Sequence, residues 1–291
     1  MGISIVSPGE LRATRPDWPA RTIVVDARSR KEFLDGHVPG ALWMGWEEWS
    51  MPAPPEAGAV LARPGYWGVL AAIDPETAGA RLASLGLRDD APTVVYGDGT
   101  RTRGAEGRIA WMLLYFGARD VALVDGGWSA WLAAGGAAET GDVPRATGTM
   151  SVRLRSERRR TLGELRTAYR EGALPLLIDT RSPAESAGDD FEYLPRRGHL
   201  PGAESVPFAD LFASDGRYVS KEHYLAHLPA AASGATQMVA YCEVGVRAAL
   251  FALLHEAYTG SVVAVYDGSL MEWGLQSDLP VETGLVTTPT P

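Results

Sequence analysis

The stretch Ile23-Val-Val-Asp-Ala-Arg-Ser29 returns later in the chain as Leu176-Leu-Ile-Asp-Thr-Arg-Ser182. Each copy is a run of apolar β-formers that ends in Asp-x-Arg-Ser. Apolar runs without polar alternation are typical of strands that are covered on both faces, and such strands belong to parallel sheets with helices on each side. The repeated stretch therefore predicts an α/β fold that is built twice.

Four further pairs of segments match between the two halves of the chain, in the same order. Five matches in one order indicate an internal duplication, so we predict two similar domains over residues 1–140 and 161–291, joined by a linker over residues 141–160. Each domain is expected to be a doubly wound, mainly parallel sheet with helices on both faces. The further pairs are Ser7–Arg12 with Thr161–Arg166, Gly36–Ala41 with Gly198–Ala203, Val94–Tyr96 with Val239–Tyr241, and Val124–Trp128 with Val265–Ser269.

The composition restricts the partners and the location of the protein. Its 291 residues carry a formal net charge of −9, which argues against nucleic acid or an anionic membrane as a partner. The one cysteine allows neither an intramolecular disulfide nor a cysteine cage for a metal ion. No apolar stretch approaches the length of a membrane span. We therefore expect a cytoplasmic protein with no metal and no other cofactor.

That one cysteine, Cys242, follows the apolar run Val239–Tyr241 and precedes an Ala- and Leu-rich helical pattern. This order places the thiol at a strand-to-helix turn, where the first amides of the helix and the helix dipole favour a thiolate. Arg247 lies five residues further on and adds a positive charge. We interpret Cys242 as a nucleophile with an anion pocket around it; the alternative is a buried cysteine that serves as a small apolar side chain.

The motifs together resemble the tandem-domain rhodanese family of sulfurtransferases, and the resemblance covers nearly the whole chain. In that family the C-terminal domain is catalytic and the N-terminal copy lacks the catalytic cysteine. Aligning Tyr96 on Tyr241 places Gly97 opposite Cys242, in agreement with that pattern. The motifs that carry the resemblance are Asp-x-Arg-Ser in both copies, Gly36–Ala41, Gly198–Ala203, Cys242–Arg247 and Tyr266–Ser269 followed by Glu272–Gly274.

The resemblance implies transfer of a sulfane sulfur through a Cys242 persulfide. The donor would be a small sulfur anion, thiosulfate or 3-mercaptopyruvate, and the acceptor would be cyanide, a small thiol or a protein thiol. Related phosphatases enclose five residues between cysteine and arginine, whereas Cys242 and Arg247 enclose four; phosphatase is therefore the weaker alternative. A sulfur-relay module with slow turnover of small donors is the second one.

The loop after the thiol is expected to supply backbone amides that stabilise the persulfide. Gly245 fits a position with unusual backbone torsions. Arg247 is expected to bind the anionic donor; the alternative is an ion pair with a carboxylate that fastens the loop. The loop comprises Glu243, Val244, Gly245, Val246 and Arg247.

Further side chains are predicted around the thiol from their positions in the motifs. Additional guanidinium groups are candidates for the anionic end of the donor, and they belong to Arg181, Arg196 and Arg197. Asp179 is expected to orient the loop, Asp267 and Ser269 to lie at the end of the neighbouring strand, and Trp273 to form an apolar wall.

The twin positions of His37 and His199 favour a structural role for both histidines. In relatives that use mercaptopyruvate, an Asp, an N-domain His and a C-domain Ser are proposed to assist catalysis. Asp26, His37 and Ser269 resemble those positions, and this catalytic arrangement stays open as an alternative.

The residues after the thiol do not decide the donor. Glu243 and Val244 match neither the cation of thiosulfate-preferring relatives nor the Gly and small polar residue of mercaptopyruvate-preferring ones. Arg247 resembles the thiosulfate branch, so thiosulfate is the favoured donor. The direction of the Glu243 side chain decides how strongly its carboxylate repels that donor.

Overall fold

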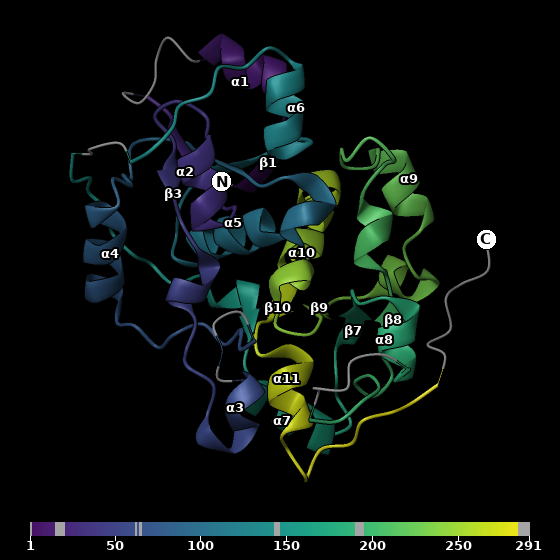
Figure 1. Cartoon of the computed structure of the whole chain (residues 1–291). Coiled ribbons are helices and arrows are strands. Elements are labelled where there is room, and N and C mark those ends of the chain that lie inside the picture. Colours follow the sequence, from purple (N-terminus) through teal and green to yellow (C-terminus); the bar gives the residue numbers. More distant parts are fainter. Residues whose placement is uncertain are drawn as a thin grey trace. The chain divides into compact units, whose positions relative to one another are not determined.

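Two five-stranded sheets, in which every strand pair is parallel, form the framework of this computed structural model (Figure 1). The structure describes residues 2–14, 21–61, 63, 66–142, 146–189 and 195–284. The first sheet has the order β1-β5-β4-β2-β3 and the second the order β6-β10-β9-β7-β8. Since the second order repeats the first strand by strand, the predicted duplication and the doubly wound α/β fold are confirmed.

The strands are short. Those of the first sheet are β1 (Gly2–Val6), β2 (Ile23–Asp26), β3 (Leu42–Trp43), β4 (Thr93–Tyr96) and β5 (Asp120–Val124). Those of the second are β6 (Arg159–Arg160), β7 (Leu176–Asp179), β8 (Glu204–Ser205), β9 (Met238–Tyr241) and β10 (Ala264–Tyr266).

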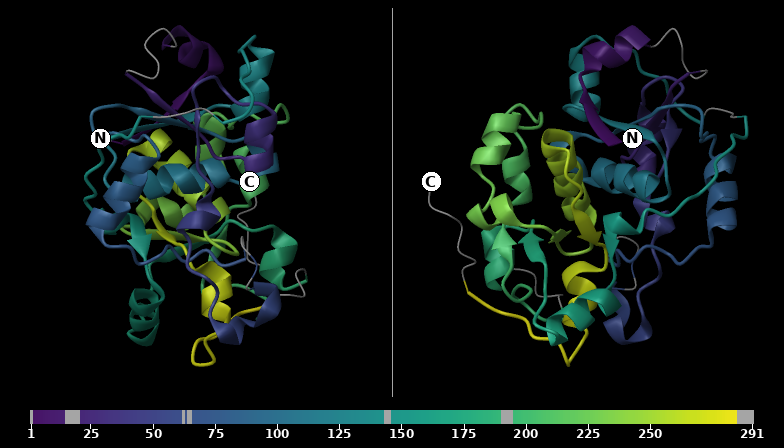
Figure 2. Two further views of the ribbon diagram at one scale, coloured as in Figure 1. Left: turned by 60° about the vertical axis from the view of Figure 1, so that its left-hand side comes forward. Right: turned by 180° about the vertical axis from the view of Figure 1, so that it is seen from behind.

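Helices connect the strands of each sheet (Figures 1 and 2). The α-helices of the first half of the chain are α1 (Pro8–Thr14), α2 (Arg30–Asp35), α3 (Gly58–Leu61), α4 (Pro75–Ser84), α5 (Ala105–Tyr115) and α6 (Gly127–Ala133). Those of the second half are α7 (Leu162–Arg170), α8 (Pro183–Ala187), α9 (Lys221–Ala226), α10 (Val246–Thr259) and α11 (Ser269–Gly274). Short 3-10 helices are η2 (Trp46–Trp49), η3 (Pro55–Ala57), η4 (Gly99–Thr102), η5 (Ser156–Arg158), η6 (Phe208–Leu211) and η7 (Ala230–Gly234).

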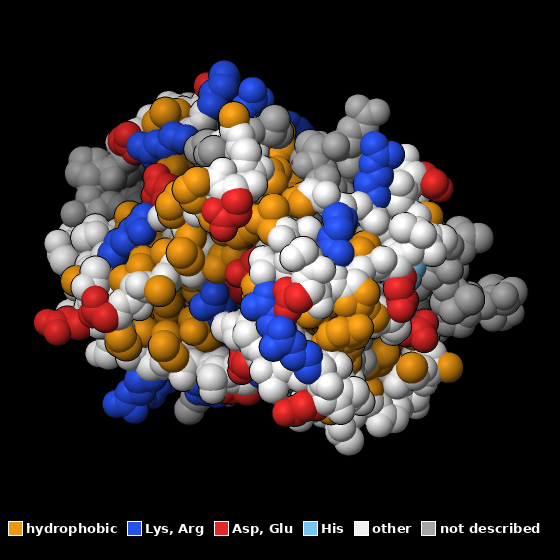
Figure 3. All heavy atoms as spheres, turned by 90° about the horizontal axis from the view of Figure 1, so that it is seen from below, with side chains coloured by type: hydrophobic (Ala, Val, Ile, Leu, Met, Phe, Trp, Pro, Cys, Tyr) orange, Lys and Arg blue, Asp and Glu red, His pale blue; other side chains and the backbone are white. Residues whose placement is uncertain are grey.

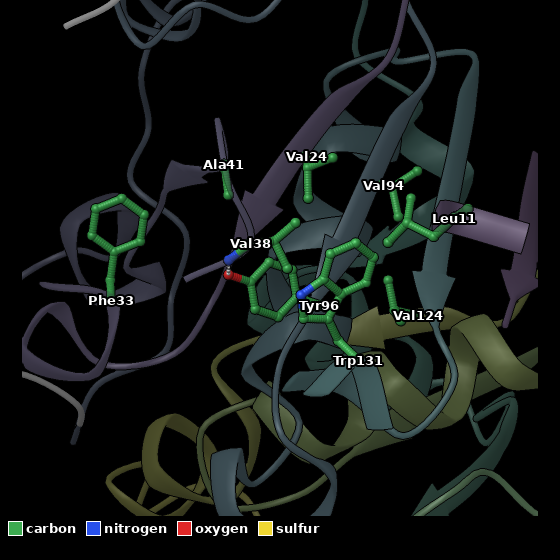
Figure 4. Close-up of a cluster of buried hydrophobic side chains, with 10 residues drawn as sticks. Leu11, Val24, Phe33, Val38, Ala41, Val94, Tyr96, Val124 and Trp131 are labelled. Atoms are coloured by element: carbon green, nitrogen blue, oxygen red, sulfur yellow. Dashed lines mark hydrogen bonds between the residues drawn. The ribbon is translucent and has the colours of Figure 1, made fainter. Parts of the chain in front are cut away.

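Both faces of the first sheet are buried, as the continuous apolar strands require. Successive side chains of a strand point to opposite faces. One set packs with side chains of α1, α2 and α6 and of the segment before β3. The resulting cluster is drawn in Figure 4 and comprises Leu11, Val24, Phe33, Val38, Ala41, Val94, Tyr96, Ala122, Val124 and Trp131. The other set, Val25, Val95 and Leu123, is also fully buried, and α5 packs on β4 and β5.

The two compact units of the structure exchange segments between the sequence copies. Unit 1 comprises Met1–Trp46, Ala72–Ser156 and Phe212–Tyr218. Unit 2 comprises Glu47–Ala71, Glu157–Leu211 and Val219–Pro291. The expected boundaries at 1–140, 141–160 and 161–291 follow sequence similarity and treat each copy as continuous, whereas packing assigns residues 47–71, here called the first arm, to unit 2. Residues 212–218, the second arm, belong to unit 1.

The end of the predicted linker is part of the second sheet. β6 pairs with β10, so residues 159–160 form an edge strand and not a solvated connection. Arg158 makes two hydrogen bonds to Glu256, of 2.6 and 2.9 Å, and Arg159 forms an ion pair with Asp267. The arginines at this end of the linker are therefore fastened to unit 2. Residues 143–145 lie outside the described part of the chain.

The surface gives no sign of a single extended charged patch on the face drawn in Figure 3, where basic and acidic side chains are interspersed. Within the residues that the structure describes, no helix has the length and hydropathy needed to cross a bilayer.

Candidate active site

Cys242 lies directly after β9 and four residues before Val246, the first residue of α10, at the carboxyl edge of the second sheet. Gly245 caps the helix with φ of 75° and ψ of 7°, a left-handed conformation that favours glycine. A Cβ atom at this position would also lie 2.6 Å from the Asp267 carbonyl oxygen. The predicted strand-turn-helix geometry around the thiol is thus present, and it requires glycine on two independent grounds.

The turn after β10 holds the cysteine loop from its backbone. The Cys242 amide donates to Ser269 Oγ at 3.0 Å, and Ser269 adopts a φ of 52°, a strained value for a residue with a side chain. The Leu270 and Met271 amides donate to the carbonyl oxygens of Cys242 and Glu243, at 3.2 and 3.1 Å. Ser269 is therefore a support for the loop backbone.

The thiol is enclosed and faces a backbone amide. Cys242 is unpaired, and only 1% of its surface is exposed. The Gly245 amide lies 3.1 Å from Sγ and points at it. The 14-residue helix α10 starts at the next residue, so its positive end and its first amides are close to the sulfur. This environment stabilises negative charge on a thiolate or on a persulfide.

Arg247 is held by two carboxylates. Its guanidinium makes a bidentate pair with Glu185, at 2.8 and 2.6 Å, and Nη2 lies 3.6 Å from Glu243 Oε2. Burial by itself lowers the pKa of Arg247, but the hydrogen bonds to Glu185 and the negative charge at Cys242 outweigh burial and raise the pKa. Arg247 is therefore a permanent cation whose main partner is Glu185, as in the second of the two roles expected from sequence.

The Glu243 side chain does not extend into solvent. It is 9% exposed, and its carboxylate is on the same guanidinium as Glu185. The Glu185 and Glu243 carboxylates thus share the Arg247 guanidinium in the loop that carries the thiol.

Arg181 is not available to a sulfur donor, contrary to expectation. It is fully buried, and its guanidinium donates to the Asp179 carboxylate at 2.9 and 2.5 Å and to the carbonyl oxygens of Glu185 and Gly198. Asp179 also accepts from the hydroxyl of Tyr241, at 2.9 Å. These contacts fix the end of β7 against Tyr241, the residue that precedes the thiol; the orienting role of Asp179 stays a prediction.

The first copy contains the same network without a thiol. Arg28 pairs with Asp26 at 2.6 Å, Asp26 accepts from the Tyr96 hydroxyl at 2.6 Å, and that hydroxyl accepts from the Val38 amide at 3.0 Å (Figure 4). A network that is present in both copies serves the fold that they share. Asp26 therefore has a structural partner set in unit 1.

The two histidines of the repeated loops make matching contacts. His37 Nδ1 lies 2.8 Å from the Phe33 carbonyl oxygen, and His199 Nδ1 lies 2.9 Å from that of Ser186. Each imidazole Nε2 lies within 3.7 Å of a glutamate, Glu139 or Glu282. The matched contacts favour the structural role over the catalytic alternative for His37.

The remaining predicted site residues, Arg196, Trp273 and Arg197, differ in their contacts and in their exposure. Arg196 donates to the carbonyl oxygens of Trp273, Gly274 and Gln276, so it closes the end of α11 instead of facing a donor. Trp273 is fully buried, and its Nε1 donates to the Pro280 carbonyl oxygen at 2.7 Å. It is a core residue. Arg197 is exposed and stays a predicted donor contact.

The volume that a thiol would need in the first copy is filled by other side chains. A Cβ atom at Gly97 would lie 2.1 Å from Glu106 Oε2 and 2.6 Å from Thr102 Oγ1. Glu106 is buried, it accepts from Thr102 at 2.8 Å, and burial raises the pKa of its carboxyl to about 7. In the first copy, a buried carboxyl group therefore lies at the place that corresponds to the thiol of the second copy.

We predict that Glu106→Gln stabilises the protein at pH 8 and hardly at all at pH 5. The raised pKa means that the folded state keeps a proton that the unfolded state loses above pH 4.5, so stability falls as pH rises toward 7 and stays reduced above it. A neutral amide removes this penalty of at most about 3 kcal/mol. The measurement is the free energy of unfolding in urea at both pH values.

The control for this change is Glu76→Gln, which removes the same charge from an exposed position of α4. It should show no gain that depends on pH. An equal stabilisation by Glu106→Gln at pH 5 and at pH 8 would contradict a raised pKa of Glu106.

Sequence reasoning missed two partners of the site. Glu185, which holds Arg247, lies three residues after Ser182, the N-cap of α8, and the Ser182-x-x-Glu185 capping box was the available sequence signal. Leu70 of the first arm donates its amide to Asp267 at 2.7 Å. No pattern in the sequence connects these two positions.

Comparison with known proteins agrees with this architecture. The model of the rhodanese-like domain matches residues 7–134 and 161–276. The "probable 3-mercaptopyruvate sulfurtransferase" of Pseudomonas aeruginosa is 32% identical over 286 residues, which cover 94% of this chain and 95% of the relative. The thiosulfate sulfurtransferase of Corynebacterium glutamicum is 30% identical over 274 residues, 90% of this chain and 85% of the relative.

A solved structure shows the same fold. The crystal structure of SseA from Escherichia coli, a 3-mercaptopyruvate sulfotransferase, superposes with a TM-score of 0.71 at 24% identity, covering 91% of this chain and 98% of SseA. Two domain matches, two relatives matched over 85% or more of their length and the repeated parallel sheets lead to one assignment: the chain belongs to the rhodanese family of sulfurtransferases.

Proposed function

We propose that Cys242 is the residue that carries the sulfur, as a persulfide. The observation that supports this most directly is the Gly245 amide, which lies 3.1 Å from Sγ at the start of α10. A buried structural cysteine needs no donor aimed at its sulfur, whereas a thiolate or persulfide gains from one. The first copy, in which Gly97 and Glu106 occupy this place, cannot carry a persulfide.

The reaction consists of two displacements at sulfur. The Cys242 thiolate attacks the outer sulfur of the donor; a new S–S bond to Sγ forms, the bond between outer sulfur and donor breaks, and its electron pair leaves with sulfite or with the enolate of pyruvate, which takes up a proton. An acceptor nucleophile, cyanide or a thiolate, then attacks that outer sulfur and releases the Cys242 thiolate. The loop amides stabilise the anion in both states.

The donor is thiosulfate or 3-mercaptopyruvate, and the relatives do not separate the two, because the matched sulfurtransferases with either donor name are 32 and 30% identical to this chain. The two donors differ in charge, so the charges of the loop act on them unequally. Thiosulfate is a dianion, and the guanidinium of Arg247, the last residue of the thiol loop, is shared by Glu185 and Glu243. A carboxylate about 6 Å from an anionic oxygen costs roughly 2–3 kcal/mol at an effective dielectric near 20.

The test of the proposed function is a comparison of both donors on the purified protein, with cyanide and with a dithiol as acceptors. A high kcat/KM with either donor, together with one added sulfur on the peptide that contains Cys242, supports an enzyme of small donors. Stable loading of that peptide with slow turnover supports a sulfur relay, which the negative charge of Glu243 beside the thiol favours. Absence of added sulfur on Cys242 would refute both.

Replacing Glu243 by glutamine is expected to raise kcat/KM for thiosulfate about tenfold, because one negative charge leaves the loop while Arg247 keeps its pair with Glu185. The gain for 3-mercaptopyruvate, which carries one carboxylate, should be smaller. Raising the salt concentration should reduce the gain, since the screening length falls to about 8 Å at 0.15 M. Initial rates with each donor at two ionic strengths measure this effect.

The matched control is Glu222→Gln, which removes the same charge from an exposed position of α9 in unit 2 and should change neither rate. If Glu243→Gln leaves the thiosulfate rate unchanged, the Glu243 carboxylate does not act on the donor.

We also propose that the protein works in a reducing, cytoplasmic environment, because its one thiol has to be free for catalysis.

A further inference from the structure

The first arm lies directly on the cysteine loop. A Cβ atom at Gly68 would come within 1.7 Å of the Val244 carbonyl oxygen and 2.8 Å of the Asp267 carbonyl oxygen. The backbone torsion of Gly68 is not left-handed, so glycine is needed here for space alone. The arm backbone therefore packs against the middle of the loop Cys242–Arg247, at a distance that no side chain permits.

Asp267 fastens the arm at this place. Its carboxylate accepts from the Leu70 amide at 2.7 Å and from Arg159 Nε at 3.1 Å, and Arg159 Nη2 lies 3.4 Å from the Leu70 carbonyl oxygen. Asp267 is 1% exposed. A buried carboxylate with a cation and a backbone amide as partners is a strong, directional anchor. The same residue also lies against the loop, because a Cβ atom at Gly245 would come within 2.6 Å of the Asp267 carbonyl oxygen.

The arm has a stem that limits its freedom. Ser50 and Leu70 form an antiparallel bridge; the Met51 amide donates to the Val69 carbonyl at 2.7 Å, and the Ala71 amide donates to the Trp49 carbonyl at 2.8 Å. Leu70 and Trp49 are almost completely buried. These contacts therefore restrain the position of the segment around Gly68 against the loop.

The first copy repeats this arrangement with the second arm. Asp125 occupies the position of Asp267 after the equivalent strand, and it accepts from the Tyr218 amide at 2.8 Å and from Arg217 Nη1 at 3.3 Å. Phe212 and Tyr218 form an antiparallel bridge, as Ser50 and Leu70 do. The second arm thus lies in a unit that has no thiol, which provides an internal control for any role of the arms.

We propose that the first arm, through Gly68 and its anchor Asp267, positions the Cys242 loop for sulfur transfer, so that Gly68 and Asp267 are positioning residues of the reaction. The inference rests on the proposed function of Cys242. The loop is clamped on two sides: the turn 267–271 binds the backbone of Cys242 and Glu243, and the arm restrains Val244. The amide of Gly245, which faces Sγ, lies between these two restraints.

The test uses Gly68→Ala and Asp267→Asn in the full chain. Gly68→Ala has to move the Val244 carbonyl, and since displacements of about 1 Å at a reacting group cost on the order of 100-fold, kcat should fall about 10- to 100-fold while KM for the donor changes less than about threefold. Asp267→Asn keeps an acceptor for Leu70 but loses the charge that binds Arg159, so kcat should fall about tenfold. Both variants should lower the thermal midpoint, because the added methyl group overlaps a backbone carbonyl and the amide removes the buried charge that pairs with Arg159. Rates are therefore compared at a temperature at which circular dichroism shows each variant to be folded.

Two matched substitutions serve as controls. Gly234→Ala adds the same methyl group in unit 2 where no atom lies within 4 Å, and Asp125→Asn makes the same change in the anchor of the second arm. Both should retain wild-type kcat. Equal losses for Asp125→Asn and Asp267→Asn, or an unchanged kcat in folded Gly68→Ala, would overturn the proposal.

A second readout separates this proposal from the proposed function and from simple destabilisation. The rate of alkylation of Cys242 by iodoacetamide is measured against pH, which requires no sulfur transfer. In Gly68→Ala the pH of half-maximal alkylation should rise, because the amide that faces Sγ is displaced. Partial unfolding would instead speed up alkylation of the buried thiol without that shift. A shifted profile in a chain that transfers no sulfur would refute the function and keep the positioning role; an unshifted profile would refute positioning.

Discussion

Cys242→Ser is expected to reduce sulfur transfer to less than about a hundredth of the wild-type rate, because a hydroxyl at neutral pH is a far weaker nucleophile than a thiolate and cannot hold a sulfane sulfur. The fold should be unaffected. One atom changes, no disulfide is lost, and the Gly245 amide that faces Sγ can donate to the serine oxygen in its place. Activity assays with both donors and a thermal unfolding curve measure these two outcomes.

Mass spectrometry supplies the control for this prediction. Since the chain has one cysteine, one added sulfur after donor treatment has one possible site, and it should appear on the wild type and be absent from Cys242→Ser. Activity above about a hundredth of the wild-type rate in the serine variant would show that another group performs the transfer.

The fold was readable from the sequence because its determinants are local. The apolar runs before Asp26 and Asp179 form buried parallel strands, and the capping box of Thr161 and Glu164 opens α7. The turn at Cys242 was equally local: a strand, a left-handed Gly245 and a helix follow one another within the motif. Features of this kind need only neighbouring residues, so a single sequence is sufficient to predict them.

The charges around the thiol were less predictable, because each guanidinium has more than one candidate carboxylate. Arg181 was expected at the donor, yet it is buried against Asp179 two residues earlier in the chain. The pair of Arg247 with Glu185 joins residues 62 positions apart. In both cases burial decides the outcome, since a buried cation requires a partner. Burial depends on the packed structure and cannot be derived from residue type alone.

The contacts of the first arm could not be predicted for the same reason. Leu70 and Asp267 are 197 positions apart, and Gly68 has no turn signal that would mark it as a close-contact position. Similarity between the copies also concealed the arm, because the loops after η2 and η6 differ in length and only the flanking motifs match. The exchange of arms between the units is thus a property of packing.

The exchange leads to the second large expected effect, on the separate C-terminal half. A protein consisting of residues 157–291 contains Cys242, its loop and all strands of the second sheet, but it lacks the first arm. Asp267 then has no Leu70 amide to bind. The buried side chains of Trp49, Trp67 and Leu70 are missing, so the apolar surface that they cover becomes exposed to solvent. We expect poor solubility and sulfur transfer at least about 100-fold below that of the full chain, as a misplaced loop implies.

Supplying the missing arm in trans tests the cause of this loss. Co-expression of residues 1–156 with residues 157–291 provides the first arm again, and it should recover soluble protein and sulfur transfer. The same experiment with Gly68→Ala in the N-terminal piece should recover solubility but little activity, because the arm is present and the space for Val244 is not. A monomeric, stable and fully active 157–291 protein would show that the loop holds its geometry without the arm. The first half of the chain would then be dispensable for sulfur transfer.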